Sequence, residues 1–188
     1  ELPEVGGVEL TTFALGLYSG TSRDDLLVVH FPNGAAPGGV FTTSSTRSAD
    51  VDWCRSALKS SEVRARALVV NAGNSNAFTG QAGIEKNRAT TDAVVGLAGC
   101  VDTNVYLAAT GVIGEPLPPA RVADGVRAAW PALGKPDWEK AANAIRTTDT
   151  FAKASGATTE IAGRAVNVAR AARGSCQSRR RARLSSAE

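Results

Sequence analysis

Apolar runs of strand length alternate along the chain with longer segments of helical period, and this alternation constrains the fold more than any other feature. The run at residues 65–70 is predicted to be a strand covered on both faces of its sheet. Residues 82–97 then repeat with a helical period, and residues 104–109 form the next predicted strand. The helix is predicted to turn four side chains inward: Ala89, Ala93, Val94 and Leu97. Strands and helices in this order indicate an α/β domain of layered sheets flanked by helices.

Turn residues separate the other predicted strands. We expect strands at residues 8–17 and 26–31, joined by a polar turn, and extended structure again at residues 40–43. Near the end of the chain, residues 157–161 and 164–169 alternate like the two arms of a β-hairpin.

Three helix starts are predicted from the chemistry of helix termini. Asp50 is expected to cap a short helix, because a carboxylate accepts hydrogen bonds from unpaired N–H groups at a helix N-terminus. A second helix is expected to start at Pro118 or Pro119 and to end before Pro131. Asp137 is expected to cap a third helix.

The charge of the chain is unevenly distributed over its 188 residues, a length that suits one domain with a sizeable core. Seven Arg and one acidic residue lie within residues 164–188, so the net charge of +3 belongs to this segment. The rest has 14 basic and 17 acidic residues and a net charge of −3. Nucleic-acid binding is disfavoured, because it would rest on one short segment rather than on a charged face.

The sequence lacks the features of a membrane or secreted protein. No apolar run has the length of a membrane span, and the first residues lack the basic start and apolar stretch of a signal peptide. Three widely spaced Cys argue against a disulfide framework. These observations predict a cytoplasmic protein without membrane association.

Most of the usual catalytic constellations are absent from the sequence. His30 is the only histidine and ends an apolar strand, so a structural role is favoured over that of a base in a serine triad. Ligands at zinc spacing, a Walker loop and the dinucleotide-binding glycine pattern do not occur. The functional prediction therefore depends on a few polar segments.

Thr110 and Gly111 form the most informative of these segments. They are predicted to end the strand at residues 104–109 and to turn directly into the proline-started helix. Such a turn leaves backbone N–H groups and a hydroxyl unpaired, and these donors can hold an oxyanion. An equally supported alternative is a turn in which Thr110 caps the helix.

Two further segments are rich in hydrogen-bonding side chains. Residues 147–150 place three threonine hydroxyls and a carboxylate after the third predicted helix. On residue chemistry alone, a loop bonded to itself is somewhat favoured there over a binding site. Residues 71–80 contain three Asn and two Gly, and we interpret them as a scaffold around a pocket, held by side-chain hydrogen bonds.

These three segments, in their order and spacing, resemble the ornithine acetyltransferases (glutamate N-acetyltransferases), and the resemblance extends over residues 5–170. They read Val-Asn-Ala-Gly-Asn with Ala-Phe-Thr-Gly within 70–80, Ala-Thr-Gly-Val-Ile-Gly at 109–114, and Ala-Ile-Arg-Thr-Thr-Asp-Thr-Phe at 144–151. The second and third motifs, in that order, are highly specific. The resemblance implies the layered α/β fold of self-processing enzymes with an N-terminal nucleophile.

By this resemblance, the chain is the α subunit of an enzyme whose precursor cleaves itself before a threonine. The new N-terminal Thr of the β chain is the nucleophile, and its own α-amine is the base. Acetyl would pass from N-acetylornithine to that Thr and then to glutamate, a ping-pong transfer in arginine biosynthesis. Thr110 and Gly111 would stabilise the oxyanion, and Thr147 would bind substrate. An α2β2 or larger assembly without a cofactor or metal is implied, and a bifunctional member would also use acetyl-CoA as acetyl donor.

The end of the chain departs from the family pattern. We assign residues 1–169 to the α-chain domain and residues 170–188 to an atypical Arg-rich tail. Arg173 falls where the family has a substrate-binding lysine, and it would replace a point charge by a fork of donors. The tail indicates either a reading-frame or sequence-assignment error or a genuine basic segment.

Two other functions stay open as hypotheses. A self-processing aminopeptidase or amidase with an N-terminal nucleophile would have a similar fold but release its acyl group to water. A basic-tailed nucleic-acid-binding protein would instead depend on residues 170–188. Hydrolysis without glutamate would indicate the first, and salt-dependent binding that is lost with the tail would indicate the second.

Overall fold

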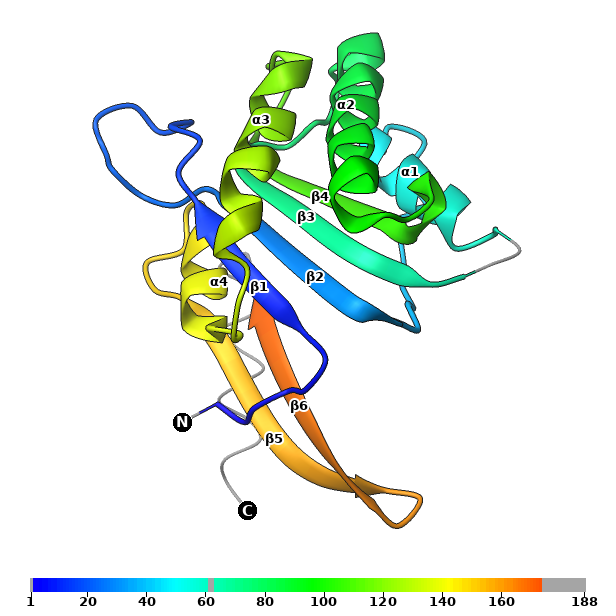
Figure 1. The fold of residues 1–188 in the computed structure, drawn as a ribbon. Helices are drawn as coiled ribbons and strands as arrows, with labels where there is room; N and C mark the ends of the chain where they lie inside the picture. Colours follow the sequence, from blue (N-terminus) through cyan, green and yellow to red (C-terminus); the bar gives the residue numbers. More distant parts are fainter. Residues whose placement is uncertain (1, 61–62, 174–188) are drawn as a thin grey trace.

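The structure, a computed structural model, describes residues 2–60 and 63–173. Its strands are β1 (Glu9–Phe13), β2 (Leu26–Ala35), β3 (Ala65–Asn74), β4 (Val105–Val112), β5 (Lys153–Ile161) and β6 (Arg164–Ala172). Its helices are α1 (Ala49–Ala57), α2 (Gly80–Ala98), α3 (Pro119–Ala129) and α4 (Trp138–Ala144), with short 3-10 turns at Asp102–Asn104 and Trp130–Ala132. Figure 1 shows a layered α/β arrangement, as predicted.

The first four strands form one mixed sheet in the order β1-β2-β3-β4. The β1–β2 and β2–β3 pairs are antiparallel, whereas β3 and β4 are parallel and joined through helix α2. Parallel strands end at the same edge of a sheet, and here Gly73 of β3 pairs with Gly111 of β4. Strands β5 and β6 form the predicted hairpin, extended to residues 153–172, which projects from the body (Figure 1).

Helices cover both faces of the four-stranded sheet (Figure 1). On one face, helices α2 and α3 close over a core that contains Leu26, Val28, Ala67, Val69, Val94, Val105, Leu107, Val122 and Val126. On the other face, α4 packs Ala141 and Ala144 against a smaller cluster to which Leu68 and Val70 of β3 contribute. The prediction that the strand at residues 65–70 is covered on both faces is therefore confirmed.

The lengths of the first strands differ from those predicted. Strand β1 ends at Phe13 because the buried carboxylate of Asp25 accepts hydrogen bonds from the N–H groups of Leu15 and Leu17, at 2.5 and 2.7 Å. These N–H groups therefore do not pair with a neighbouring strand. Strand β2 is longer than predicted, whereas residues 40–43, expected to be extended, form no strand.

The predicted helices are present, and two of the three predicted starts are confirmed. Asp137 caps α4, because its carboxylate accepts a hydrogen bond from the N–H of Lys140 at 2.9 Å. Helix α3 begins at Pro119. Asp50 was predicted to cap α1, but that prediction is wrong: Ser48 occupies the N-cap position, and Asp50 lies within the first turn with its side chain buried.

Candidate active site

Two glycines bring the backbones of β3 and β4 into close contact where the strands end. Gly111 has φ +137°, and a Cβ atom there would lie 2.3 Å from the carbonyl carbon of Gly73. Gly73 has φ +118°, and a Cβ atom on it would lie 2.7 Å from the side chain of Leu17. Only glycine permits both the backbone conformation and the approach.

Thr110 lies inside strand β4 rather than in a turn after it, which corrects the sequence-based prediction. The strand continues to Val112, and the next helix begins only at Pro119, so Thr110 is not its cap. The Thr110 side chain is 5% exposed, and its Oγ1 has no hydrogen-bond partner among the residues that the structure describes. An unpaired buried donor costs about 1–3 kcal/mol, so the position of this hydroxyl calls for an explanation beyond the packing of this chain.

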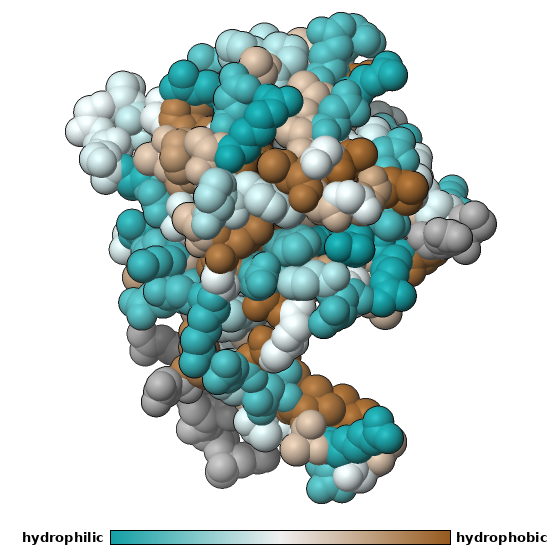
Figure 2. All heavy atoms as spheres, viewed as in Figure 1, coloured by the Kyte–Doolittle hydropathy of each residue, from teal (hydrophilic) through white to brown (hydrophobic). Residues whose placement is uncertain are grey.

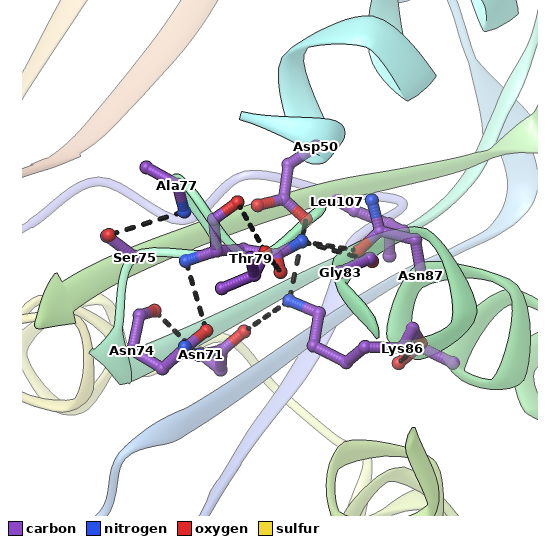
Figure 3. Close-up of polar contacts among 12 residues, drawn as sticks. Asp50, Asn71, Asn74, Ser75, Ala77, Thr79, Gly83, Lys86, Asn87 and Leu107 are labelled. Carbon is purple, nitrogen blue, oxygen red and sulfur yellow. Dashed lines mark hydrogen bonds and ion pairs between the residues drawn. The ribbon is translucent and has the colours of Figure 1, made fainter. Parts of the chain in front are cut away.

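Side-chain amides hold the loop that follows β3. Asn71 Nδ2 donates to the carbonyl of Asn74 at 3.1 Å, and Asn74 Oδ1 accepts from the N–H of Asn76 at 3.0 Å. The N–H of Ser75 donates to the carbonyl of Val112 at 2.9 Å, which ties the loop to β4. Figure 3 shows these amides converging on the loop. The predicted scaffold of side-chain hydrogen bonds is confirmed.

The same loop lines a cavity of about 550 Å³ between α1 and the start of α2. Its walls include Trp53, Phe78 and Ile84, while Asn76 and Asn87 contribute polar atoms. Both amides are buried and bonded to each other, with Asn76 Nδ2 at 3.1 Å from Asn87 Oδ1. The loop therefore borders a pocket, as predicted.

A buried lysine beneath this loop was not identified from the sequence. Lys86 of α2 is 3% exposed; its Nζ donates to Asn71 Oδ1 at 3.1 Å and lies 3.5 Å from Asp50 Oδ1 (Figure 3). Burial raises the pKa of the Asp50 carboxyl and lowers the pKa of the Lys86 ammonium, and each charge partly offsets the shift of the other. The side chains thus form a buried pair of opposite charges.

Helix α2 buries Ala93 and Val94 as predicted, but most of its inward face is polar. Leu97, expected inside, is 39% exposed. The buried positions of α2 are Gly83, Lys86, Asn87, Thr90, Thr91, Ala93 and Val94. A signal was available, because these polar residues share a helical face with the two apolar ones and the Asn-rich loop requires hydrogen-bond partners.

The structure brings together the two residues predicted to bind substrate. Arg173, after β6, donates from Nε to Oγ1 of Thr147, after α4, at 3.1 Å. Thr147 is half-buried and Arg173 is exposed. Among the described residues, no hydrogen bond joins either of them to Thr110.

The rest of the threonine-rich segment is bonded to itself. Arg146 Nη1 donates to the carbonyls of Asp149 and Thr150 at 3.4 and 3.2 Å, and the Asp149 carboxylate pairs with Lys153. These contacts match the alternative of a self-bonded loop for part of the motif, while Thr147 faces Arg173. The segment is thus an ordered loop with one hydroxyl directed to a cation.

Other candidate chemistry is limited within the described ranges. His30 Nδ1 lies 3.0 Å from Glu9 Oε2 and its ring packs against Trp130, in agreement with a structural role. Over residues 2–60 and 63–173, no group of three or more His, Cys, Asp or Glu could hold a metal ion. In the same ranges, no helix combines the length and the hydropathy needed to cross a membrane.

The fold and site define a class of layered α/β protein with a glycine-lined strand pair and an unpaired buried hydroxyl. Comparisons with known proteins identify the class more closely. A model of the ArgJ family matches residues 9–178, and the chain belongs to this family.

Two solved structures share the fold. The arginine biosynthesis bifunctional protein ArgJ of Bacillus halodurans superposes with a TM-score of 0.80 at 25% identity, covering 91% of this chain and 88% of that one. An ornithine acetyltransferase of Mycobacterium tuberculosis, solved in complex with ornithine, superposes with a TM-score of 0.78 at 28% identity, covering 91% of this chain and 90% of that one. The expected α/β fold of this family is therefore confirmed.

Curated relatives are considerably longer than this chain. The arginine biosynthesis bifunctional protein ArgJ of Gluconobacter oxydans is 43% identical over 176 residues, which are 93% of this chain and 41% of that protein. The protein of the same description from Zymomonas mobilis is 43% identical over 175 residues, 93% of this chain and 42% of that protein. The chain thus spans about two fifths of the length of these relatives.

The Arg-rich tail lies mostly outside the described residues. Strand β6 continues through Ala172, past the division at residue 169 that the sequence suggested. Residues 174–188 are not among the described residues, so the interpretation of residues 170–188 as an atypical tail stays a prediction.

Proposed function

We propose that this chain is the α part of an acyltransferase that moves acetyl from N-acetylornithine to glutamate in arginine biosynthesis. Membership of the ArgJ family supports the reaction, and relatives of the chain are named as an arginine biosynthesis bifunctional protein and as an ornithine acetyltransferase. The observation that carries the proposal is the buried Thr110 hydroxyl next to Gly111, which has no hydrogen-bond partner within residues 2–60 and 63–173. These two groups are a donor pair suited to a carbonyl oxygen that becomes negatively charged.

The proposed reaction has two halves. The hydroxyl of an N-terminal Thr on a separate β chain attacks the acetyl carbonyl, and its proton passes to the α-amine of the same residue. Thr110 Oγ1–H and Gly111 N–H stabilise the oxyanion, which collapses to an acetyl ester as ornithine leaves with the proton. The amine of glutamate then attacks the ester through a second oxyanion, and N-acetylglutamate and the free Thr are released.

Thr147 and Arg173 are the proposed contacts for the substrate. Their hydrogen bond at 3.1 Å places a hydroxyl beside a guanidinium, and a guanidinium presents a fork of donors to a carboxylate. N-acetylornithine and glutamate both carry a carboxylate. No bound cofactor is proposed, and acetyl-CoA would serve only as a second acetyl donor in a bifunctional enzyme.

A β chain with an N-terminal Thr is the proposed partner. The matched chains of the solved relatives are about as long as this one, whereas the curated relatives are more than twice as long, which supports a division of the precursor into two chains. Large apolar side chains next to the site motifs are exposed: Val112 55%, Ile113 65% and Phe151 52%. A second chain would cover them in an α2β2 or larger cytoplasmic assembly.

The test is acetyl transfer by this chain produced together with its β chain. Thr110→Ala should lower kcat by about 10²–10³-fold, because one oxyanion donor is lost. Thr147→Ala should mainly raise the KM for N-acetylornithine. Thr91→Val is the control, since this buried threonine lies on α2 and its Oγ1 has no partner among the described residues.

Two results would contradict the proposal. A wild-type kcat in Thr110→Ala together with a wild-type KM for N-acetylornithine in Thr147→Ala would remove both residues from the site. Release of acetate to water at the same rate with and without glutamate would indicate the hydrolase alternative instead.

A further inference from the structure

Lys86 and Asp50 form a buried ion pair that the proposed reaction does not use. Each side chain is 4% exposed, and they join two helices, α2 and α1. Taking two charges out of water is costly, and replacing such a pair by apolar residues often leaves a protein as stable as before. The fold alone therefore does not explain why a lysine is buried here.

Hydrogen bonds lead from this pair to the site. Lys86 Nζ donates to Asn71 Oδ1 at 3.1 Å, and Asn71 Nδ2 donates to the carbonyl of Asn74 at 3.1 Å (Figure 3). Asn74 pairs with both Thr110 and Val112, at the point where the register between β3 and β4 shifts. The chain of contacts from Lys86 therefore ends at the irregularity beside Thr110.

Two further contacts tie the segment that follows Gly111 to the same loop. Asn74 Nδ2 donates to the carbonyl of Glu115, and the N–H of Ser75 donates to the carbonyl of Val112 at 2.9 Å. Because Gly111 packs directly against the backbone of β3, a change in this loop changes the direction of the Gly111 N–H. Its orientation thus depends on how Asn71 holds the loop.

We infer that Lys86 is a positioning residue for the proposed acyl transfer: by donating to Asn71, it sets the irregular end of β3 and so aims the Gly111 N–H and the Thr110 hydroxyl at the oxyanion. Asp50 keeps the ammonium in place. The kinetic part of this inference rests on the proposed function, whereas the placement of the two donors can be measured without it.

The decisive variant is Asp50→Asn with Lys86→Met, which leaves no unpaired charge buried and still removes the donor to Asn71. In the two-chain enzyme, we expect kcat to fall about 10- to 100-fold, because misplacement of catalytic groups by an ångström has an effect of this size. The KM for N-acetylornithine and the unfolding temperature should stay near the wild-type values. Thr91→Val, on the same helix, should change none of these.

A double-mutant cycle tests the route through Asn71. Asn71→Ala should lower kcat to a similar extent, and adding it to the Asp50/Lys86 variant should cause no further loss, because both changes break the same contact. If the two reductions in kcat multiply in the combined variant, the changes act separately, and the proposed route from Lys86 through Asn71 is overturned.

Amide NMR of the two-chain enzyme, with only this chain isotope-labelled, gives the readout that is independent of catalysis. The Thr110 and Gly111 amide resonances should move in the Asp50/Lys86 variant and stay in place in Thr91→Val. If these resonances move while the wild-type two-chain enzyme transfers no acetyl, the inference about placement is supported and the proposed function fails. An unmoved Gly111 resonance overturns the inference, whatever the turnover.

Discussion

Thr110 and Lys86 are both buried polar side chains, yet their surroundings are opposite. Lys86 has a carboxylate and an amide oxygen within 3.5 Å, whereas Thr110 Oγ1 has no partner among the described residues. Buried polar groups in folded proteins are nearly always satisfied, so each exception needs an explanation. Within the described part of the chain, Thr91 Oγ1 is another such exception, and Thr110 differs from it in lying beside the glycine contact between β3 and β4. At the scale of single residues, Lys86 is satisfied within the fold, and the unpaired Thr110 hydroxyl is the proposed oxyanion donor.

The buried pair predicts opposite pH dependences for its two single variants. In Lys86→Met, Asp50 has no counter-charge, and burial raises its folded-state pKa above the ordinary 3.8. The folded chain then binds the proton more tightly than the unfolded chain, so stability falls as pH rises from 3.8 through the raised pKa. In Asp50→Asn, burial lowers the pKa of Lys86 below 10.5, so stability rises with pH through the lowered pKa toward 10.5.

Urea unfolding across this pH range measures both effects. Near neutral pH, each single variant should lose about 3–5 kcal/mol, because one buried charge is left unpaired. The double variant should show neither slope. If the stability of both single variants changed with pH in the same direction, the result would contradict the ion pair between Asp50 and Lys86.

At the scale of elements, the order of strands and helices followed from the sequence. The C-terminal end of β4 and the position of Asp50 within α1 did not. The hairpin and the cap at Asp137 depend on local turn and capping chemistry, which a sequence pattern reveals. Strand β4 passes its predicted end because β3 pairs with it through Gly111, a contact between residues distant in the chain. Asp50 was misassigned for the same reason, since its partner lies on another helix.

The structure tests the geometry of the candidate site, whereas the roles of its residues stay predictions. The motif containing Thr110 and Gly111 indicated donors for an oxyanion, and Thr147 and Arg173 lie in contact. That Lys86 supports the site could not be read from the helical period, because a periodicity that counts only apolar residues overlooks a polar stripe.

The pairing of β3 with β4 predicts a sharp difference between two glycine substitutions. Gly111→Ala should destabilise the chain by at least about 1–3 kcal/mol, because alanine is strained at φ +137° and its Cβ would overlap Gly73. Gly96→Ala, at an open position of α2, should stabilise it by about 0.5–1 kcal/mol through helix propensity. Thermal unfolding measures the change in stability of each variant. Equal changes in stability for Gly111→Ala and Gly96→Ala would contradict the close contact between β3 and β4.

At the scale of the whole molecule, exposed apolar side chains are the feature that bears on the proposed β-chain partner. Figure 2 shows hydrophobic side chains on the projecting hairpin and over the helical layer, with a hollow where the hairpin leaves the body. Ile161 and Val168 of the hairpin are 59% and 45% exposed, and Phe78 beside α2 is 69% exposed. Apolar surface of this extent is typical of an interface, and the relatives contain more than twice the length of this chain.

The most direct test of the central proposal is the mass of each chain after the two-chain enzyme reacts with N-acetylornithine in the absence of glutamate. We predict that the β chain gains one acetyl group on its N-terminal Thr, that this chain gains none, and that glutamate removes the label. With Thr110→Ala, the label should accumulate more slowly. An acetyl group on this chain, or transfer to glutamate without any acetylated β chain, would contradict the account.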